Sequence, residues 1–442
     1  MSAKFSGIRL VVASATLGTS LDFYDFLVYG SLVSVLAANF FPPGDPYVAI
    51  MSTLAVYGVG WIARPVGGII FGRMGDLVGR KRTFIVTILT IGLATTFMAF
   101  LPTYQSAGLV ATALLVILRL TQGLGLGGEY STSGTFVSEF SSDSQRGLAT
   151  AFSQQLSISV GTLLGLGVIF SLSTALGTAG VTSYGWRIAF LLSLVLLAVG
   201  LVMRFKLTET PAFRELREAR MLSKRPVSEA IKTNWKTMVK MILGVQAGVS
   251  VINYTATYTG PIIVMTTIMR PPVNLALASQ VATIGILISL PFYPLFGWLS
   301  DRIQSRKKIM YPGMLASAIT LYPLYYLVGY GRDTGNIVMM ISGVALMAII
   351  STAATGLNGA FWTETFPTRV RNTSYGIANN LGSAIFGGFA PFVIAAIVNA
   401  TGGQLFAGLL WPIAVPVAAV IIGGLGLKET HCKLATAATP VN

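Results

Sequence analysis

The chain has 442 residues, of which 53% are hydrophobic and only 10% are charged, and its mean hydropathy is +0.73. These values exclude an ordinary soluble protein and indicate an integral membrane protein. The formal net charge of +15 would suggest nucleic-acid binding in a soluble protein. In a membrane protein it reports the topology instead, and no nucleic-acid partner is expected.

Apolar windows of about 20 residues recur along the chain, and each is about long enough to cross a hydrocarbon core of ~30 Å as a helix. The runs are continuous and rich in Leu, Ala and Gly, unlike the alternating strands of a membrane β-barrel, so they predict an all-α membrane protein. We predict twelve transmembrane helices, over residues 12–40, 48–72, 83–101, 108–135, 148–176, 186–204, 238–262, 275–299, 309–329, 336–360, 375–399 and 405–427.

Lysine and arginine residues are distributed unevenly between the predicted loops. When the loops are assigned alternately to two sides, one side receives nearly all of them and the other only Arg187, Arg270 and Arg332. The positive-inside rule then places both termini in the cytoplasm, for a multi-pass protein of the cell (inner) membrane. The first span has no cleavage pattern and is expected to remain in the mature protein. One cysteine, Cys432, and one histidine, His431, are too few for a metal site, and no cofactor is expected.

The longest polar stretch divides six predicted spans from six. It predicts an N-terminal six-helix bundle over 1–204, a cytoplasmic central loop over 205–236, and a C-terminal six-helix bundle with a short cytoplasmic tail over 237–442.

Polar motifs in the loops of the two halves repeat at a constant offset of 225 residues, and KLTET after the sixth span is matched by GLKET after the twelfth. Such a repeat indicates two homologous bundles, with a binding cavity expected between them near the middle of the membrane. The matched positions are Asp76 with Asp301, Glu139 with Glu364, and Arg146 with Arg371.

Several motifs resemble those of a known family. GRMGDLVGRKR, from Gly72, resembles the G-x-x-x-D-R-x-G-R-[RK] loop motif of the major facilitator superfamily, although Leu77 stands where that motif usually has Arg, and Gln304 and Ser305 replace Gly and Arg in the second copy. The paired Glu-x6-Arg loops resemble the sugar-porter branch of that superfamily. YDFLVYG, FFPPGDP, GWIARPVGGIIFGRMGD and RLTQGLGLGGEY resemble the metabolite:proton symporters, which carry citrate and other carboxylates, shikimate, and betaine-like osmolytes. The resemblance covers essentially the whole chain and implies two six-helix bundles that rock around a central site.

Two carboxylates lie inside the first predicted span. Asp22 and Asp25 are three residues apart and therefore share one helix face, which Tyr29 continues. An ionised carboxylate within the hydrocarbon costs at least ~2.5–3.5 kcal/mol on insertion scales, so each should face a cavity or a cation.

Two basic residues are placed deep in spans, namely Arg64 and Arg119. One interpretation is that they pair permanently with Asp22 or Asp25 and fasten the first helices together. The other is that one carboxylate binds and releases a proton as substrate arrives, which is the minimum equipment for proton-coupled transport. Either arginine could also bind a substrate carboxylate through two hydrogen bonds.

Arg119, Gln122 and Gly123 match the RxxQG-type motif of the superfamily, and that resemblance implies a role for Arg119 in proton coupling. Glu129 follows near the inner end of the same span, in the GGE turn, where we predict a gating or packing role.

The repeated loop charges have two interpretations. They form either a solvated cluster, or a set of ion pairs and helix-end contacts between the bundles that closes the cytoplasmic side and breaks when the carrier faces inward. Because the repeat reproduces acid and base at matching sites, we predict the second. The predicted gate consists of Asp76, Arg80, Glu139, Arg146, Asp301, Arg306, Glu364 and Arg371.

Polar side chains in the spans are candidates for binding substrate, although a lone Asn in a membrane helix can equally hold helices together. We find no ionisable residue deep in the second half, so proton coupling is expected in the first. The predicted substrate-binding set is Arg64, Arg119, Tyr29, Gln122, Asn253, Tyr254, Tyr258, Asn358, Asn379 and Asn380, with Gln246 as a further polar candidate.

These observations predict a proton-driven uptake carrier for a small polar metabolite, most simply an organic acid. A zwitterion such as a betaine would also use both charge types, and an uncoupled facilitator is a further alternative. No nucleophile or metal constellation indicates an enzyme. The expected partners are the substrate, the proton and the lipid bilayer, and we expect a monomer to be sufficient.

Overall fold

The computed structural model describes residues 2–43, 46–257, 260–269, 271–430 and 433–435. Within these ranges the regular structure is entirely helical, which confirms the predicted all-α class. Four residues named above lie outside the described ones, namely Tyr258, Arg270, His431 and Cys432.

The first half of the chain forms long helices interrupted by short π-helical segments, which are labelled η. These elements are α1 (Ser2–Ser31), α2 (Val33–Phe40), α3 (Pro46–Leu77), α4 (Arg80–Met98), α5 (Tyr104–Ala107), α6 (Leu109–Phe140), α7 (Arg146–Thr150), η1 (Ala151–Leu156), α8 (Ser157–Gly180), η2 (Val181–Gly185), α9 (Trp186–Leu191) and α10 (Ser193–Phe205).

The segment predicted as the central loop carries α11 and most of α12, and the second half of the chain follows. Its elements are α11 (Pro211–Glu218), α12 (Pro226–Met241), η3 (Ile242–Gln246), α13 (Ala247–Ala256), α14 (Gly260–Ile263), η4 (Val264–Ile268), α15 (Leu275–Ser289), α16 (Phe292–Ile303), α17 (Lys307–Asp333), α18 (Ile337–Thr355), α19 (Asn358–Thr365), α20 (Arg371–Gly382), η5 (Ser383–Gly388), α21 (Ala390–Ala400) and α22 (Leu405–Gly426).

Each predicted span coincides, within the described residues, with one helix or with consecutive helical segments. Seven helical stretches of the described chain are long and apolar enough to cross a membrane by length and composition alone, or eight if the bent pair α1 and α2 forms one span. The bend between those two helices is 69°.

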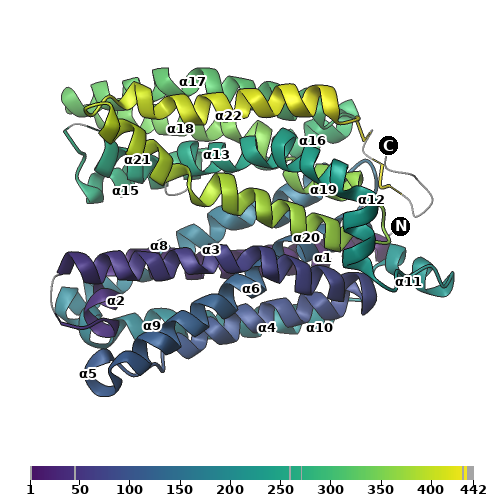
Figure 1. Cartoon of the computed structure of the whole chain (residues 1–442), viewed down its shortest axis with the longest axis horizontal. Helices are drawn as coiled ribbons and strands as arrows, with labels where there is room; N and C mark the ends of the chain where they lie inside the picture. Colours follow the sequence, from purple (N-terminus) through teal and green to yellow (C-terminus); the bar gives the residue numbers. More distant parts are fainter. Residues whose placement is uncertain (1, 44–45, 258–259, 270, 431–432, 436–442) are drawn as a thin grey trace.

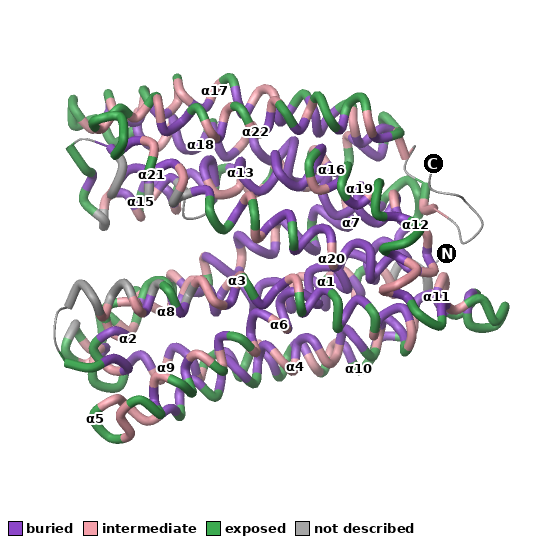
Figure 2. Tube along the Cα trace, viewed as in Figure 1, coloured by how far each residue is buried: buried purple, intermediate pink, exposed green. Residues whose placement is uncertain are grey.

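The helices from α1 to α10 lie together, and those from α13 to α22 lie beside them (Figure 1). Helix α3 packs against α6 and α17 against α18, while α20 contacts α3 and α16 contacts α7 between the two groups. The start of α1 and the end of α22 lie at the same end of the molecule. We call it the basic end, because Lys307 at the start of α17 bonds to the Leu427 carbonyl after α22, and Arg80, Lys81 and Arg146 stand at the starts of α4 and α7. Buried residues concentrate inside each group and where α20 meets the first group (Figure 2).

Helices α3 and α20 touch through their backbones. A Cβ added to Gly68 would lie 2.3 Å from the carbonyl oxygen of Gly376, and one added to Gly72 would lie 2.8 Å from the Cα of Thr373. Only glycine permits this approach, as at other close crossings of membrane helices.

Candidate functional site

The two deep charges Asp25 and Arg119 form an ion pair inside the first group of helices. Nη1 of Arg119 lies 3.0 Å from Oδ2 of Asp25 and donates to Oε1 of Gln122 at 2.8 Å. Nε2 of Gln122 in turn donates to the hydroxyl of Thr95 at 2.8 Å. Both charged side chains are 1% exposed. Helices α1, α4 and α6 are therefore joined by one polar cluster.

Tyr29 completes this cluster. The guanidinium carbon of Arg119 lies 3.6 Å from the centre of the Tyr29 ring, and the phenol donates to the carbonyl of Thr53 on α3 at 3.3 Å. Tyr29 and Gln122, both named as substrate-binding candidates, thus hold Arg119 in position in this state.

Asp22 differs from Asp25 in having no partner among the residues that the structure describes. It is 2% exposed, and neither carboxylate oxygen accepts a hydrogen bond from the described part of the chain. The charges that act on it come from Glu129, Arg204, Asp25 and Arg64. Of the pairings that the sequence left open, the one between Asp22 and Arg64 does not form.

Glu129 and Arg204 form a second buried ion pair, between α6 and α10, and both side chains are 0% exposed. Thr87 donates to the carboxylate at 2.5 Å, and the guanidinium carbon lies 3.5 Å from the Phe84 ring centre. A Cβ on Gly18 would collide with both partners, so α1 lies directly against the pair. Sequence reasoning missed Arg204 because its position at the end of a span assigned it to a loop.

A cavity of about 70 Å³ lies between the two groups of helices and is partly open to solvent. Its walls are mainly aromatic and aliphatic. The Trp61 ring contacts both Phe26 and Tyr254, each with 5.4 Å between ring centres. The lining residues are Phe23, Phe26, Leu27, Trp61, Leu126, Thr162, Leu166, Tyr254, Ile262, Ala282, Thr283 and Ile286.

Arg64 lies against this aromatic wall. Its guanidinium carbon is 4.5 Å from the Trp61 ring centre, and its Nε donates to Oδ1 of Asn380 at 3.2 Å. Asn380 also donates to the carbonyl of Gly127 at 2.7 Å. The two predicted substrate-binding residues Arg64 and Asn380 are therefore brought together across the interface.

The neighbouring amides of the second half serve a different arrangement. Oε1 of Gln246 accepts hydrogen bonds from Asn379 at 2.7 Å, from Asn358 at 3.3 Å and from the Trp362 indole at 3.2 Å. Its amide nitrogen donates to Ser250 and Ser383, each at 2.9 Å. This satisfied network favours the interpretation that Asn358 and Asn379 hold helices together.

The last two described candidates for substrate binding, Tyr254 and Asn253, lie in different surroundings. Tyr254 lines the cavity, whereas Asn253 is half-buried and its Oδ1 accepts a long hydrogen bond of 3.4 Å from Thr257.

At the basic end, Asp76 of α3 binds the start of α20 in the other half. Its two oxygens accept the backbone N–H groups of Asn372 at 3.3 Å and Thr373 at 2.8 Å. Arg80 pairs with Asp76 at 3.1 Å and with Glu139 at 3.4 Å. A carboxylate at a helix N-terminus satisfies free N–H groups and is stabilised by the helix dipole.

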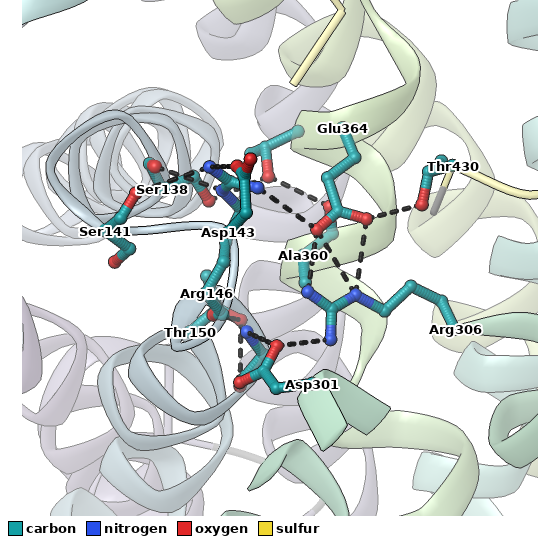
Figure 3. Close-up of polar contacts among 12 residues, drawn as sticks. Ser138, Ser141, Asp143, Arg146, Thr150, Asp301, Arg306, Ala360, Glu364 and Thr430 are labelled. Atoms are coloured by element: carbon teal, nitrogen blue, oxygen red, sulfur yellow. Dashed lines mark hydrogen bonds and ion pairs between the residues drawn. The ribbon is translucent and has the colours of Figure 1, made fainter. Parts of the chain in front are cut away.

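The second half repeats this contact in the opposite direction (Figure 3). Asp301 of α16 accepts the N–H groups of Gly147 and Leu148 at the start of α7, each at 2.9 Å. Arg306 lies between Asp301 and Glu364, at 2.7 Å from each carboxylate.

Two ion pairs cross between the halves at the same level. Glu139 pairs with Arg371 at 2.8 Å, and Arg146 lies 3.6 Å from Glu364. The predicted gate residues are therefore buried and in contact with one another rather than solvated. We call the contacts made by these eight residues the reciprocal contacts.

The KLTET and GLKET motifs explain two carboxylates that the sequence left without a role. Glu209 accepts the N–H groups of Arg80 at 3.1 Å and Lys81 at 3.2 Å. Glu429 accepts those of Arg306 at 3.1 Å and Lys307 at 3.2 Å. Each carboxylate thus caps the helix that follows the repeated loop of its own half.

The C-terminal tail lies on the reciprocal contacts. Thr430 donates to Glu364 at 2.5 Å, and the carbonyl of Ala435 accepts from Arg371 at 2.7 Å and from Thr368 at 3.2 Å.

The sequence matches the model of the Major Facilitator Superfamily over residues 15–391. The chain belongs to the major facilitator superfamily. It therefore has the major facilitator fold, with twelve transmembrane helices, as predicted. Its fold is also that of the proton:xylose symporter XylE bound to 6-bromo-6-deoxy-D-glucose, with a TM-score of 0.76, 18% identity, and 98% of both chains covered.

Relatives within this superfamily include transporters of different substrates. The glycine betaine/proline/ectoine/pipecolic acid transporter OusA of Dickeya dadantii (strain 3937) is 31% identical over 98% of this chain and 86% of its own. The citrate-proton symporter of Klebsiella pneumoniae is 29% identical over 92% and 90%, respectively. These similarities confirm the resemblance noted in the sequence and identify a multi-pass membrane transporter, a class distinct from enzymes.

Proposed function

We propose that this facilitator takes up a small carboxylate-bearing metabolite together with protons, by alternating access between its two bundles. The observation that carries the proposal is Asp22, a buried carboxylate with no hydrogen-bond partner among the described residues, which lies near the ion pairs of Asp25 and Glu129. Relatives named as a citrate-proton symporter and a betaine transporter support the same class of function.

The proton is assigned to Asp22. An isolated buried carboxylate is costly to ionise, whereas the charge of Asp25 is compensated by Arg119. A proton on Asp22 removes one negative charge from a region that already holds the carboxylates of Asp25 and Glu129. Its release accompanies release of the substrate.

Arg64 and Asn380 are proposed to bind the carboxylate of the substrate. They meet across the interface beside the cavity, and a guanidinium binds carboxylates while staying charged throughout the cycle. Arg119 is proposed to act in coupling instead, since Asp25, Gln122 and Tyr29 already hold it.

The basic end is proposed to face the cytoplasm, because it gathers the lysine and arginine residues of the loops. The reciprocal contacts then close the cytoplasmic side, and they must break before substrate can leave inward. We further propose that one copy of the chain in the bilayer is sufficient for transport.

The aromatic cavity favours a zwitterion of the betaine class as a second candidate for the substrate. Aromatic faces such as those of Phe26, Trp61 and Tyr254 attract quaternary ammonium groups, and Arg64 would hold the carboxylate. Uptake of labelled glycine betaine, citrate, 2-oxoglutarate, shikimate and a neutral sugar into proteoliposomes distinguishes the candidates. In this interpretation Trp61→Leu raises KM for betaine at least about tenfold, since cation–π contacts at desolvated sites reach about 2 kcal/mol.

The coupling is tested in the same vesicles, with an inward proton gradient and a record of external pH. We expect wild type to accumulate one substrate and to alkalinise the medium. Asp22→Asn should retain exchange of substrate without a gradient but lose accumulation and the pH change. The exposed carboxylate Asp333 provides a matched control, and Asp333→Asn should behave as wild type. Equilibration without a pH change in the wild-type protein would instead identify an uncoupled facilitator.

A further inference from the structure

A groove of about 670 Å³ opens on the surface between α1 and the start of the α7–η1 helix, near the basic end. Its α1 wall is one helix face, formed by Ile8, Arg9, Val12, Ala13, Thr16 and Leu17. The opposite wall is formed by Gln145, Leu148, Ala149 and Phe152. The groove lies away from the interhelical cavity and shares no lining residue with it.

The polar groups of the groove are confined to one end. Arg9 and Gln145 are exposed there, and Arg9 has neither an ion pair nor a hydrogen bond within the described chain. Deeper along α1 the wall is apolar, since the only hydroxyl, that of Thr16, donates to the carbonyl of Val12 at 2.8 Å. From Ile8 to Leu17 the apolar wall extends roughly 13 Å.

We propose that this groove binds one anionic phospholipid from the bilayer, with its phosphate at Arg9 and an acyl chain along Val12, Ala13 and Phe152. A charged head at the membrane surface and an apolar tail directed inward match the order of the groove, and basic pockets between transmembrane helices recognise such head groups. Charge complementarity selects an anionic lipid, because the described residues that line the groove include no carboxylate and nearby Asp143 is bound by Arg146 at 2.8 Å.

The lipid would touch the gate from outside. Leu148 lines the groove, and its backbone N–H is one of the two that Asp301 accepts from α7. A lipid that fills the groove therefore supports the helix that the second half holds when the basic end is closed. This inference does not depend on the identity of the substrate.

Native mass spectrometry of the full-length protein, purified and then exposed to phosphatidylglycerol or phosphatidylcholine, tests the proposal. We expect wild type to retain one phosphatidylglycerol. Arg9→Gln should lower its occupancy at least tenfold, and Ala13→Phe, which fills the groove, should do the same without removing charge. Matched controls are Arg73→Gln, an exposed arginine at the same end, and Ala113→Phe, an exposed alanine on α6; both should retain the lipid.

Equal retention of phosphatidylglycerol by all four variants would overturn the site. Retention of phosphatidylcholine as tight as that of phosphatidylglycerol would overturn the assignment of an anionic lipid. Thermal unfolding of each variant in the same detergent identifies any that is misfolded. If Arg9→Gln is misfolded, Arg9→Lys replaces it in the test; this variant keeps the charge and should retain the lipid.

Discussion

The two halves of the chain contribute alike at the basic end and differently in the middle of the molecule. At the basic end each half contributes the same contact, since Asp76 caps α20 while Asp301, 225 residues later, caps α7. In the middle, the first half buries Asp22, Asp25 and Arg119, whereas the second half places a neutral network around Gln246. The contacts at the basic end are thus symmetric, whereas the buried ionisable residues of the middle are not.

This difference separates two requirements of a rocking carrier. Closing one end requires matched surfaces on both halves, so duplicated residues remain useful in both copies. Coupling to a proton requires a titrating site in only one half. A buried carboxylate in the second half as well would add the cost of another buried charge. Variants in one half only can therefore distinguish residues of the proposed gate, which both halves share, from residues of proton coupling, which only the first half contains.

The largest effect is expected from Asp25→Asn, which leaves Arg119 buried without its counter-charge. Breaking one partner of a buried pair costs about 3–5 kcal/mol, so we expect accumulation in proteoliposomes to fall about a hundredfold or more and the melting temperature to drop. Asp25→Asn combined with Arg119→Gln should recover the melting temperature but not the accumulation. Normal accumulation by the single variant would assign the pair a purely structural role.

The symmetry of the gate is tested by Asp76→Asn and Asp301→Asn. Each removes a charge-assisted contact to two N–H groups, worth about 1.5–3 kcal/mol, so each should open the basic end about tenfold or more, to a similar extent. The readout is maleimide labelling of Ser138→Cys, whose hydroxyl contacts Thr363 across the interface at 2.7 Å, in a Cys432→Ser background. A strong effect of only one variant would show that the gate is asymmetric.

The control for that experiment is Asp333→Asn, because the Asp333 side chain is 57% exposed and pairs with Arg332, which is not a member of the reciprocal contacts. Its labelling rate should match that of the parent protein.

A smaller effect is expected from Gln246→Leu in the second half. Asn358 and Asn379 would each lose an acceptor, whereas the Trp362 indole would keep its bond of 2.9 Å to Oδ1 of Asn358. Unsatisfied buried donors cost about 1–3 kcal/mol each. We expect a lower melting temperature, with KM for substrate changed less than about threefold. A large increase in KM at unchanged stability would place the network in the binding site.

The smallest effect concerns Glu429 in the tail. Burial raises the pKa of its carboxyl, but hydrogen bonds from the Ser305 hydroxyl and from the N–H groups of Arg306, Lys307 and Thr430 lower the pKa below its ordinary value of 4.5. A lowered pKa stabilises the folded tail above that value, and the contribution is lost as pH falls through the folded-state pKa.

Hydrogen exchange of residues 428–435, corrected for intrinsic rates, should therefore increase a fewfold below about pH 4.5. Glu429→Gln should remove this pH dependence. Exchange that is equally pH-dependent in both proteins would exclude Glu429 as the cause.

The sequence predicts the contacts at the basic end well, because the residues that form them repeat in register. Asp76 and Asp301 occupy equivalent loops, and equivalent loops of homologous halves must meet at one end of the bundle. The partners of Asp25 could not be predicted, because pairing between helices depends on their rotation about their own axes. Asn379 and Asn380 illustrate this limit, since adjacent residues point in different directions, one to Gln246 and the other to Arg64.

Arg204 and Glu209 were missed for another reason. Both lie where a span gives way to a loop, and charge at such a boundary normally indicates solvent. The structure buries Arg204 against Glu129 and uses Glu209 to cap α4. The repeated KLTET and GLKET motifs were the one signal that could have indicated a cap, because matching carboxylates follow the last span of each half.

The glycine crossing of α3 and α20 offers a pivot for the proposed rocking of the two bundles. Where Gly68 meets Gly376, backbone lies directly on backbone, so the side chains of these two residues do not interlock. The two helices can therefore rotate against each other at this point, and the polar contacts between the bundles lie elsewhere along the helices. In the proposed rocking motion, rotation about this crossing would separate the caps formed by Asp76 and Asp301 together.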